Sequence, residues 1–418
     1  MKDKKKMVPE IRFKGFEDDW EQRKLSEIAT MNARIGWQNL RTSEFLDNGD
    51  YMLITGTDFK EGTIDYTNIH YVEKERYDQD KKIQIRNDSI LITKDGTLGK
   101  VAYVEGLTMP ATLNAGVFNV RVKEDTKVDS KYLFHYLKAP FLLKYADSQS
   151  TGGTIKHLNQ NVLVNFPIPL PSEKEQKKIG SFFKQLDDTI ALHQRKYDIL
   201  KSMKQEMLQN LFPTGQSEVP EIRFTNFNKV WEQRMLKEIS NKVTEKNKNN
   251  KFTETFTNSA EYGIISQREF FDKDISNKKN LNGYYIVRKD DFVYNPRISN
   301  YAPVGPIKRN KLGRTGIMSP LYYVFRTFDI NQSFLEYYFE TTGWHRFMKL
   351  NGDSGARADR FAIRNSIFET MSIPYPSFME QENIGAFFNK FNEDITLRQR
   401  KITELTSLKK ELLKRLFV

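Results

Sequence analysis

The amino-acid sequence predicts two α/β (α+β) globular domains, related by a pseudo-two-fold axis and joined by two long antiparallel coiled-coil helices. The first observation is a repeated opening segment: VPEIRFKGFEDDWEQRKLSEIA begins at position 8 and VPEIRFTNFNKVWEQRMLKEIS at position 219, with 14 of 22 positions identical. The second is a repeated 45-residue segment, 168–212 and 373–417, with 22 identical positions. The third is that the segments between these repeats diverge. This pattern predicts two copies of one large unit rather than a solenoid of short repeats.

The longer repeated segment has the pattern of a helix. Pro169 and Pro171 exclude a helix before it, Ser172 suits the N-cap position, and Glu175 three residues later suits a capping box. Apolar residues then recur at alternating steps of four and three over about five heptads, which is typical of a coiled-coil seam. Each helix of about 40 residues would be about 60 Å long.

The two seams predict that the helices pack on each other in antiparallel order, because the chain crosses a whole globular segment between them. Packing of each helix on its own domain alone is the other arrangement. Polar residues fall at the same steps in both copies, His193 with Arg398 and Lys204 with Lys409, and would set the register of pairing. The apolar seam residues are Ile179, Phe183, Leu186, Ile190, Leu200, Met207, Leu211, Ile384, Phe388, Phe391, Ile395, Ile402, Leu405, Leu412 and Leu416.

The divergent segments have mixed strand and helix patterns. Their expected strands form two matched pairs, and amphipathic helical patterns follow at about 129–146 and 331–350. The expected strands are 88–93 with 291–294, and 117–121 with 322–326. The domain boundaries that follow are a first domain at 1–167, a first long helix at 168–212, a second domain at 213–372 and a second long helix at 373–418.

Composition excludes several classes of protein. The chain of 418 residues has no cysteine, which excludes disulfides, thiolate catalysis and zinc ribbons, and its five scattered histidines predict no metal site. No apolar run is long enough for a membrane span or a signal core, so we expect a cytoplasmic protein. The net charge of +12 favours a polyanionic partner such as DNA or RNA.

No convincing active site is visible in the sequence. Gly96-Thr97-Leu98-Gly99-Lys100 has two residues between its glycines where a Walker A loop needs four, and Val101 stands where that loop needs Ser or Thr. Asn295-Pro296-Arg297-Ile298 departs from the methyltransferase motif it partly matches, and no glycine-rich cofactor loop precedes it. A two-lobed nuclease or DNA methyltransferase with its own active site is the alternative hypothesis, and a purely structural coiled-coil protein is another.

Recognition of a duplex is the hypothesis that remains. Two basic domains related by a two-fold axis and separated by paired helices are suited to contact DNA at two places along one face. Because the two domains differ, the expected target is bipartite and asymmetric, with an unread gap.

This layout resembles the specificity subunit of type I restriction–modification systems over essentially the whole chain. The motifs that carry the resemblance are WEQRKL and WEQRML in the opening segments, IPLP and IPYP with a following Glu-Gln, and the phrases LITKDGTLGK and TGGTIKHLN. In the second half, YNPRISN and DSGARADR stand in place of the last two phrases.

The resemblance implies a subunit without catalysis of its own, in which each domain is a target-recognition domain. It would bind two modification subunits, which carry S-adenosylmethionine and methylate adenine, and two motor–nuclease subunits, which use ATP and Mg²⁺. No cofactor is expected on this chain. The long helices would act as spacers that set the gap, and would form the docking surface for the modification subunits.

Side-chain chemistry guides the choice of candidate DNA contacts. Arg, Lys, Asn and Gln suit base edges, whereas Lys, Arg, Ser, Thr and backbone amides suit phosphates. In the first domain the candidates are Lys94, Thr97, Lys100, Thr151, Gly152, Gly153, Thr154, Lys156 and His157. In the second domain they are Arg297, Asn300, Tyr301, Arg357, Arg360 and Arg364.

Overall fold

The computed structural model describes residues 7–417 except 96, 150–156, 215–216, 272–277 and 354–358. The chain forms two compact units: unit 1 comprises residues 1–194 and 400–418, and unit 2 comprises residues 195–399. Each unit contains the beginning of one long helix and the end of the other. The four segments expected from the sequence stay a prediction, because this division cuts through both long helices.

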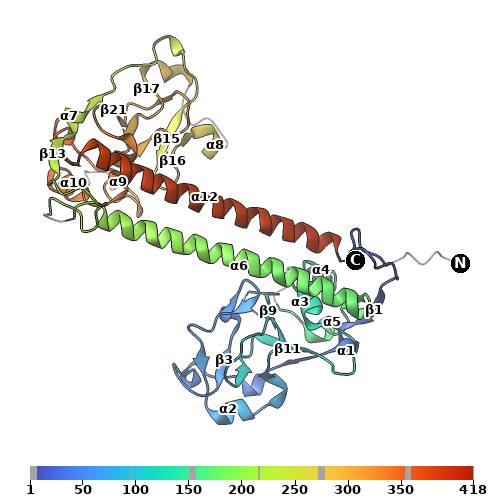
Figure 1. Ribbon diagram of the computed structural model, residues 1–418. Helices are drawn as coiled ribbons and strands as arrows, with labels where there is room; N and C mark the ends of the chain where they lie inside the picture. The colour runs from blue at the N-terminus through green and yellow to red at the C-terminus, as the bar shows by residue number, and fades with distance from the viewer. Residues whose placement is uncertain are drawn as a thin grey trace. The chain divides into compact units, whose positions relative to one another are not determined.

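Unit 1 is a mixed helix and strand domain that leads into the first long helix (Figure 1). Its elements are β1 (Glu21–Lys24), α1 (Leu25–Ile28), β2 (Ala29–Ala33), β3 (Met52–Ile54), β4 (Phe59–Lys60), β5 (Thr63–Ile64), β6 (His70–Tyr71), α2 (Lys74–Asp78), β7 (Gln84–Ile85), β8 (Ile90–Thr93), β9 (Val101–Tyr103), β10 (Ala111–Leu113), β11 (Val117–Val122), α3 (Ser130–Lys138), α4 (Phe141–Ser148), α5 (Gln160–Leu163), β12 (Pro167–Leu170) and the long helix α6 (Glu173–Asn210).

Unit 2 repeats this order with differences in its central part. Its elements are β13 (Glu232–Met235), α7 (Leu236–Ile239), β14 (Ser240–Lys242), β15 (Phe256–Ser259), β16 (Gly263–Ser266), α8 (Gln267–Phe271), β17 (Tyr285–Val287), β18 (Phe292–Tyr294), β19 (Ile307–Arg309), β20 (Gly316–Met318), β21 (Tyr323–Thr327), α9 (Gln332–Glu340), α10 (His345–Asn351), α11 (Asn365–Phe368), β22 (Ser372–Tyr375) and the long helix α12 (Phe378–Arg415).

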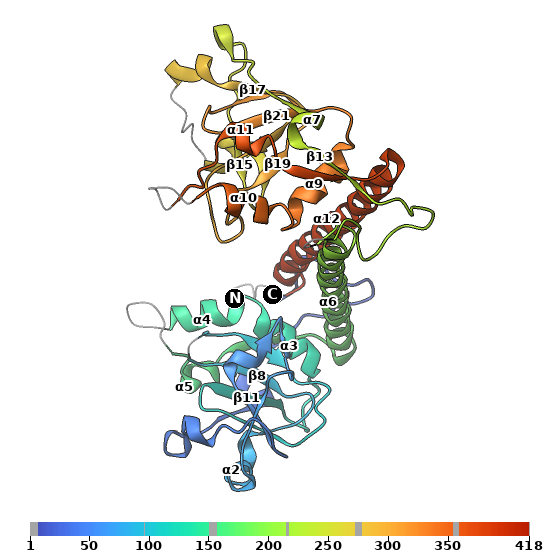
Figure 2. The same ribbon diagram turned by 90° about the vertical axis from the view of Figure 1, so that its left-hand side faces the viewer.

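A four-stranded antiparallel sheet lies in each unit, in the order β2-β11-β8-β9 in unit 1 and β14-β21-β18-β19 in unit 2. Its central strands are largely apolar because both of their faces are covered: Ile90 belongs to one apolar cluster and Leu91 to another, and both are fully buried. Figure 2 shows α3, α4 and α5 close to this sheet in unit 1. The structure confirms the expected strands as β8, β11, β18 and β21.

Each amphipathic stretch expected to be one helix is two helices in the structure. In unit 1, α3 ends at Lys138 because Ala139 precedes a proline and takes an extended conformation, and α4 begins after Pro140. In unit 2, α9 ends at extended Thr341, whose hydroxyl donates to the carbonyl of Tyr338 at 2.7 Å. The amphipathic pattern continues through both breaks, so it does not reveal them.

A buried ion pair ties each opening segment to the start of a long helix. Arg12 donates through Nε and Nη2 to the two carboxylate oxygens of Glu175, at 2.7 and 2.8 Å, and Glu175 is fully buried. This hydrogen bonding raises the pKa of Arg12. Arg223 and Glu380 repeat the contact in unit 2 at 2.6 and 2.8 Å. Because removing one partner would leave the other buried and unpaired, the pair fixes the opening segment on the helix.

The capping box expected at Ser172 is therefore only half present. The Ser172 hydroxyl accepts from the backbone N–H of Glu175 at 3.4 Å, as an N-cap should. The Glu175 side chain, however, engages Arg12 with both oxygens instead of returning to the cap. Sequence spacing predicted a local partner for the Glu175 side chain. It could not indicate Arg12, which is 163 residues away along the chain.

The glutamine that follows each of these glutamates holds the start of a domain helix. Gln176 accepts from the backbone N–H of Asp129, the N-cap of α3, at 3.0 Å, and Gln381 accepts from that of Asn331, the N-cap of α9, at 2.8 Å. Both glutamines are buried. The long helices thus contact the domain helices through backbone groups, which every sequence supplies.

A glycine in each long helix allows this close approach. A Cβ added at Gly180 would lie 2.8 Å from the backbone nitrogen of Tyr132, and one at Gly385 would lie 3.2 Å from that of Phe334. Both distances are shorter than ordinary van der Waals contact. This accounts for the glycine that both repeats have at this position.

The end of each long helix is received by an opening segment and by the beginning of the other long helix. The backbone N–H of Ile11 donates to the carbonyl of Arg415 at the end of α12, at 3.0 Å. In the same unit, Phe417 stacks on Phe183 of α6, with ring centroids 5.7 Å apart. Within unit 2, Phe212 stacks on Phe388 at 6.2 Å. In each unit the two helix segments therefore run antiparallel, as expected.

Burial along the seam shows that each long helix packs on a domain core as well as on the other long helix. The ends of the helices join the domain cores, while the seam residues farther along are half-buried. Buried seam residues are Ile179, Phe183, Leu211, Ile384, Phe388 and Leu416. Half-buried ones are Leu186, Ile190, Leu200, Met207, Phe391, Ile395, Ile402, Leu405 and Leu412. In the ranges that the structure describes, no helix combines the length and the apolar character needed to cross a membrane.

Replacing Glu175 with Gln should lower the free energy of unfolding by about 3 kcal/mol, because it breaks a buried ion pair and leaves the guanidinium without its counter-charge. Urea titration of the full chain, followed by the fluorescence of buried Trp20, measures this. The control is Glu173→Gln, which removes an exposed pairing with Lys177 and should cause no measurable change. Equal effects of the two substitutions would contradict the role given to Glu175.

Candidate nucleic-acid interface

The first predicted DNA-contacting loop follows β8 in unit 1. Thr93, the buried last residue of β8, donates its hydroxyl proton to the carbonyl of Thr97 and accepts from the backbone N–H of Lys100 at 2.9 Å. The N–H of Gly99 donates to the carbonyl of Thr93 at 2.9 Å, and the φ angle of +71° at Gly99 favours glycine. The loop is therefore a turn that is closed by hydrogen bonds to Thr93.

The turn presents its candidate residues unequally. Thr97 and Lys100 are exposed, whereas Lys94 is half-buried with its Nζ 5.7 Å from the centroid of the Phe118 ring. The two exposed side chains can contact a polyanion without first being uncovered. Lys94 would have to leave the aromatic ring to do so.

A second predicted loop lies against this turn. The backbone N–H of Leu158 donates to the carbonyl of Lys94 at 3.1 Å, and His157 Nδ1 lies 2.5 Å from a carboxylate oxygen of Asp95. The structure thus brings together His157 and the Lys94 turn, as a shared site requires. Five other candidates lie outside the described residues: Thr151, Gly152, Gly153, Thr154 and Lys156.

Unit 2 brings together the corresponding pair of loops. The backbone N–H of Phe361 donates to the carbonyl of Pro296 at 2.7 Å, and Arg297 Nη2 lies 3.6 Å from a carboxylate oxygen of Asp359. Arg297 also forms an isolated β-bridge with Arg360. Two guanidinium-bearing residues from separate parts of the sequence therefore lie on adjoining strands of backbone.

The remaining candidates of unit 2 surround these loops. Asn300 is exposed, and Tyr301 has 81% of its surface exposed. Arg364 is exposed at the N-cap of α11, and Arg360 is half-buried. Arg357 lies outside the described residues. Which of these residues contact DNA stays a prediction.

The side chains that join the two loops have opposite polarity in the two units. In unit 1 the acidic residue, Asp95, is on the loop after the central strand, and its partner is His157. In unit 2 that loop carries Arg297, and the acid is Asp359 on the other loop. The same backbone arrangement therefore carries different charged side chains in the two units. Two surfaces that recognise different sequences require such a difference.

A cavity of about 740 Å³ opens beside the second loop of unit 2. Phe361 and Tyr323 are among its buried lining residues, and Arg364 and Lys242 supply cationic groups. Lys242 Nζ lies 5.4 Å from the centroid of the Tyr323 ring. Burial, and a hydrogen bond to Glu369, raise the pKa of Tyr323, so this phenol stays neutral. Sequence reasoning missed Lys242, because it lies on β14, far from the loops along the chain.

The long helices also carry apolar side chains that face outward. Leu192 and Leu397 occupy the same position of the repeat and are 50% and 61% exposed. Met203 and Leu408 form a second such pair, at 44% and 49%. Sequence reasoning missed these residues because it followed only the inward seam. A second apolar position, repeated in both copies outside that seam, is the signal that could have revealed them.

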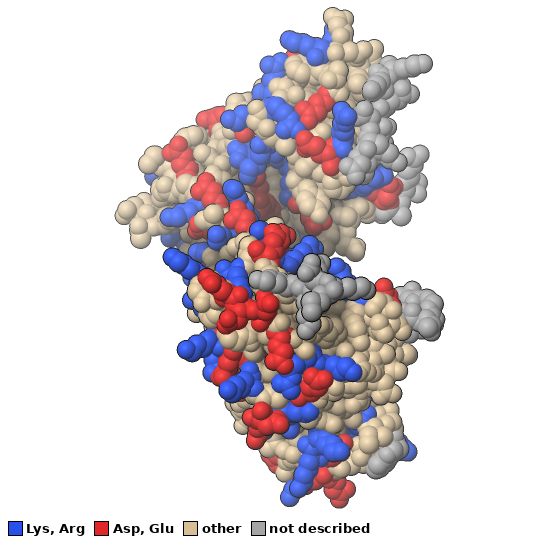
Figure 3. All heavy atoms as spheres, turned by 90° about the vertical axis from the view of Figure 1, so that its right-hand side faces the viewer, with Lys and Arg blue, Asp and Glu red and all other residues tan. Residues whose placement is uncertain are grey.

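Charged side chains lie in small groups on the face that Figure 3 presents. Figure 3 shows Lys and Arg interspersed with Asp and Glu on the face it presents, rather than one continuous basic area. In the part of the chain that the structure describes, no three His, Asp or Glu side chains are grouped so as to hold a metal ion.

The duplicated frame with two differently decorated loop pairs defines a class of binding protein with two unlike recognition surfaces. The chain matches the family described as the type I restriction modification DNA specificity domain twice, over residues 17–202 and 228–407. These matches cover most of its length, and the chain belongs to this family. Membership confirms the expected class: a non-catalytic DNA-recognition subunit of a restriction–modification complex, with DNA and other subunits as partners.

Individual relatives agree with this assignment. The chain is 21% identical over 422 residues to the MjaVIII specificity subunit of Methanocaldococcus jannaschii, covering 94% of this chain and 95% of the relative. It is 26% identical over 179 residues to the EcoR124I/EcoR124II specificity subunit of Escherichia coli, covering 42% and 43%. Its fold is similar to the crystal structure of the type I restriction–modification S subunit from M. genitalium, with a TM-score of 0.60, 15% identity and 99% of both chains covered.

Replacing Thr93 with Val should loosen the turn after β8, because the substitution keeps the shape of the side chain and removes both hydroxyl hydrogen bonds. Loss of about 1 kcal/mol of local stability corresponds to about fivefold faster exchange of the Lys100 amide hydrogen. Hydrogen-exchange mass spectrometry measures it. Thr97→Val, at an exposed position, is the control and should leave the exchange unchanged; equal acceleration in both variants would contradict the role of Thr93.

Proposed function

We propose that each unit reads one half of an asymmetric bipartite site in double-stranded DNA, and that the long helices set the gap between the halves and dock adenine-methyltransferase subunits. The observation that carries the proposal is the recurrence of one loop arrangement in both units. Each time, the loop after the central strand is hydrogen-bonded to the loop before α5 or α11, and each time the exposed side chains differ.

The two loop sets favour different base contacts. Arg297 and Arg360 suit bidentate binding of guanine O6 and N7 in the major groove. Lys100 and His157 offer single donors, and Thr97 offers a hydroxyl, which suit either phosphates or single base atoms. A half-site read through unit 2 should therefore depend more on guanine than the half-site read through unit 1.

The catalytic groups would be supplied by partners. Two modification subunits would carry S-adenosylmethionine and methylate one adenine in each half-site. Two motor–nuclease subunits, using ATP and Mg²⁺, would join for restriction in the cytoplasm. The chain itself would contribute sequence recognition and the positions of its partners.

The outward-facing leucines of the long helices support docking of two copies of one partner. An exposed apolar side chain is more costly in water than under a partner, and Leu192 recurs as Leu397 at the same place in the repeat. A surface that is duplicated with the helix offers the same contact twice. This matches two identical methyltransferase subunits better than one asymmetric partner.

Substitution of one loop arginine should relax one half of the recognised site. Arg297→Ala removes an exposed guanidinium and should cost about 1–3 kcal/mol of binding free energy at one or two base positions of a single half-site. Mapping of N6-methyladenine in cells that express the variant measures this. Lys100→Ala should affect the other half-site only. Arg400→Ala, an exposed change of the same charge on α12, is the control and should leave the motif intact.

A matched pair of substitutions tests the docking surface. Leu192→Arg and Leu397→Arg should each reduce co-purification of the methyltransferase subunit, and the double variant should abolish it, because charge replaces apolar contact. The control is Leu143→Arg, an exposed leucine on the unit 1 domain. Undiminished assembly of the double variant with two methyltransferase subunits would contradict docking at these leucines.

A further inference from the structure

The junction between domain and long helix is built from equivalent positions in the two units. Helices α3 and α9 have nine residues each and equivalent N-caps, so Lys138, the last residue of α3, corresponds to Glu340, the last residue of α9. In the repeated long helices, Asp187 corresponds to Asn392, and Lys409 corresponds to Lys204. The two lysines of the long helices are thus kept, while the groups that face them are exchanged.

In unit 1 the carboxylate comes from the long helix. Lys409 Nζ forms an ion pair with one oxygen of Asp187, and Lys138 Nζ lies 3.7 Å from the other oxygen. Lys138 also donates to the carbonyl of Glu61 at 2.7 Å. Side-chain exposures of 10% for Lys409 and 24% for both Asp187 and Lys138 leave little room for water. The Asp187 carboxylate therefore pairs with both lysines.

The surroundings of this carboxylate show how much the unit 1 junction depends on it. Burial, and then the charge of Lys409, lower the pKa of Lys138 to about 8. His135, fully buried one turn earlier, has its pKa lowered mainly by burial and then by Lys409, so its ring is neutral. Without Asp187 the junction would hold two lysines and no anion facing them from the long helix.

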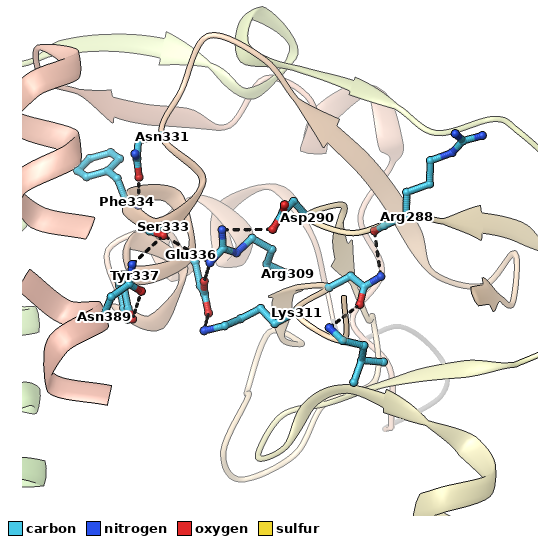
Figure 4. A network of polar contacts seen from close by, with 12 residues as sticks. Arg288, Asp290, Arg309, Lys311, Asn331, Ser333, Phe334, Glu336, Tyr337 and Asn389 are labelled. Atoms are coloured by element: carbon cyan, nitrogen blue, oxygen red, sulfur yellow. Dashed lines mark hydrogen bonds and ion pairs between the residues drawn. The ribbon is translucent and has the colours of Figure 1, made fainter. Parts of the chain in front are cut away.

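In unit 2 the carboxylate comes from the domain. Lys204 Nζ lies 2.7 Å from Glu340 Oε2, with side-chain exposures of 16% and 24%. The long helix contributes amides instead: Asn392 donates to the hydroxyl of Tyr337 at 2.7 Å, and that hydroxyl donates to Asn389 at 2.9 Å. Figure 4 shows Tyr337 beside Asn389, at the side of α9 that faces the long helix.

We propose that Lys138, Asp187, Glu340 and Asn392 form a charge-matching set that makes each recognition domain compatible with only its own place in the repeated frame. A domain whose helix ends in lysine requires an aspartate on the long helix. A domain whose helix ends in glutamate requires a neutral residue there. The lysine, the glutamine and the glycine of the frame are the same in both places, whereas Asn389, which accepts from Tyr337, stands where α6 has Lys184.

Exchange of the two domains would violate the match at both junctions. The first domain placed on α12 would bring Lys138 to Lys204 with Asn392 between them and no carboxylate. The second domain placed on α6 would bring Glu340 beside Asp187 with only Lys409 to neutralise both. Like charges in a poorly hydrated site are destabilising. If each unit reads one half-site, as proposed above, the set also fixes the order in which the half-sites are read.

A double-mutant cycle in the full-length chain tests the match without exchanging domains. Glu340→Lys should lower the urea midpoint of unfolding, because it places a second lysine beside Lys204. Asn392→Asp should raise the midpoint in the Glu340→Lys background, where it rebuilds the arrangement of unit 1. In the wild-type background the same Asn392→Asp change should lower the midpoint, because it adds a second carboxylate and removes the amide donor to Tyr337.

The reversal of sign is the expected result, and controls separate it from a general effect of charge. Glu382→Lys makes the same charge change at an exposed position of α12, and Asn392→Asp should lower the midpoint in that background as it does in the wild type. The reciprocal cycle, Asp187→Asn with Lys138→Glu, should show the same rescue in unit 1. Recovery of folded protein by both double variants is expected even where a single variant fails to fold.

An additive cycle would overturn the proposal. If Asn392→Asp shifts the midpoint equally in the wild-type and Glu340→Lys backgrounds, the two positions do not interact. Double variants as unfolded as the single ones would lead to the same conclusion. These measurements need no DNA, so their failure is distinct from a failure of the proposed recognition of half-sites.

Discussion

A buried glutamate that faces an arginine from the opening segment fixes the start of each long helix, and the rest of the architecture depends on that contact. Glu175 holds Arg12 and Glu380 holds Arg223 with nearly the same geometry. The opening segment in turn receives the end of the other long helix through a backbone hydrogen bond at Ile11. Unit 1 is thus closed by residues from the beginning, the middle and the end of the chain, which a purely local helix cap would not achieve.

At the start of α3 the frame holds the domain by its backbone. Gln176 binds the N–H of Asp129, and Gly180 leaves room for the start of α3. Neither contact depends on most of the domain's side chains, so the loops that follow β8 and β18 are free to diverge. The charged residues at the ends of α3 and α9 contact the frame through their side chains, and there the frame differs between its two copies as well.

Much of the fold could be predicted because the sequence contains two copies of the opening segment and two copies of the long helix. The long helices, the central strands and the divergence between frames all follow from repetition and periodicity. The partner of Glu175 could not be predicted, since a local capping motif explained the same spacing. The contact between the Lys94 turn and His157 depends on three-dimensional packing of loops about 60 residues apart, for which apolar periodicity carries no information. The outward position of Leu192 was not predicted, because this residue lies outside the apolar seam from which the helix packing was inferred.

Genome-wide mapping of N6-methyladenine, with this gene intact and with it deleted in the same host, tests the central claim most directly. Loss of one asymmetric bipartite motif on deletion, with all other methylated motifs unchanged, is the result expected of a DNA-specificity subunit with two unlike recognition domains. An unchanged pattern of methylation, in cells where the methyltransferase subunit is shown to be expressed and assembled with this chain, would contradict it.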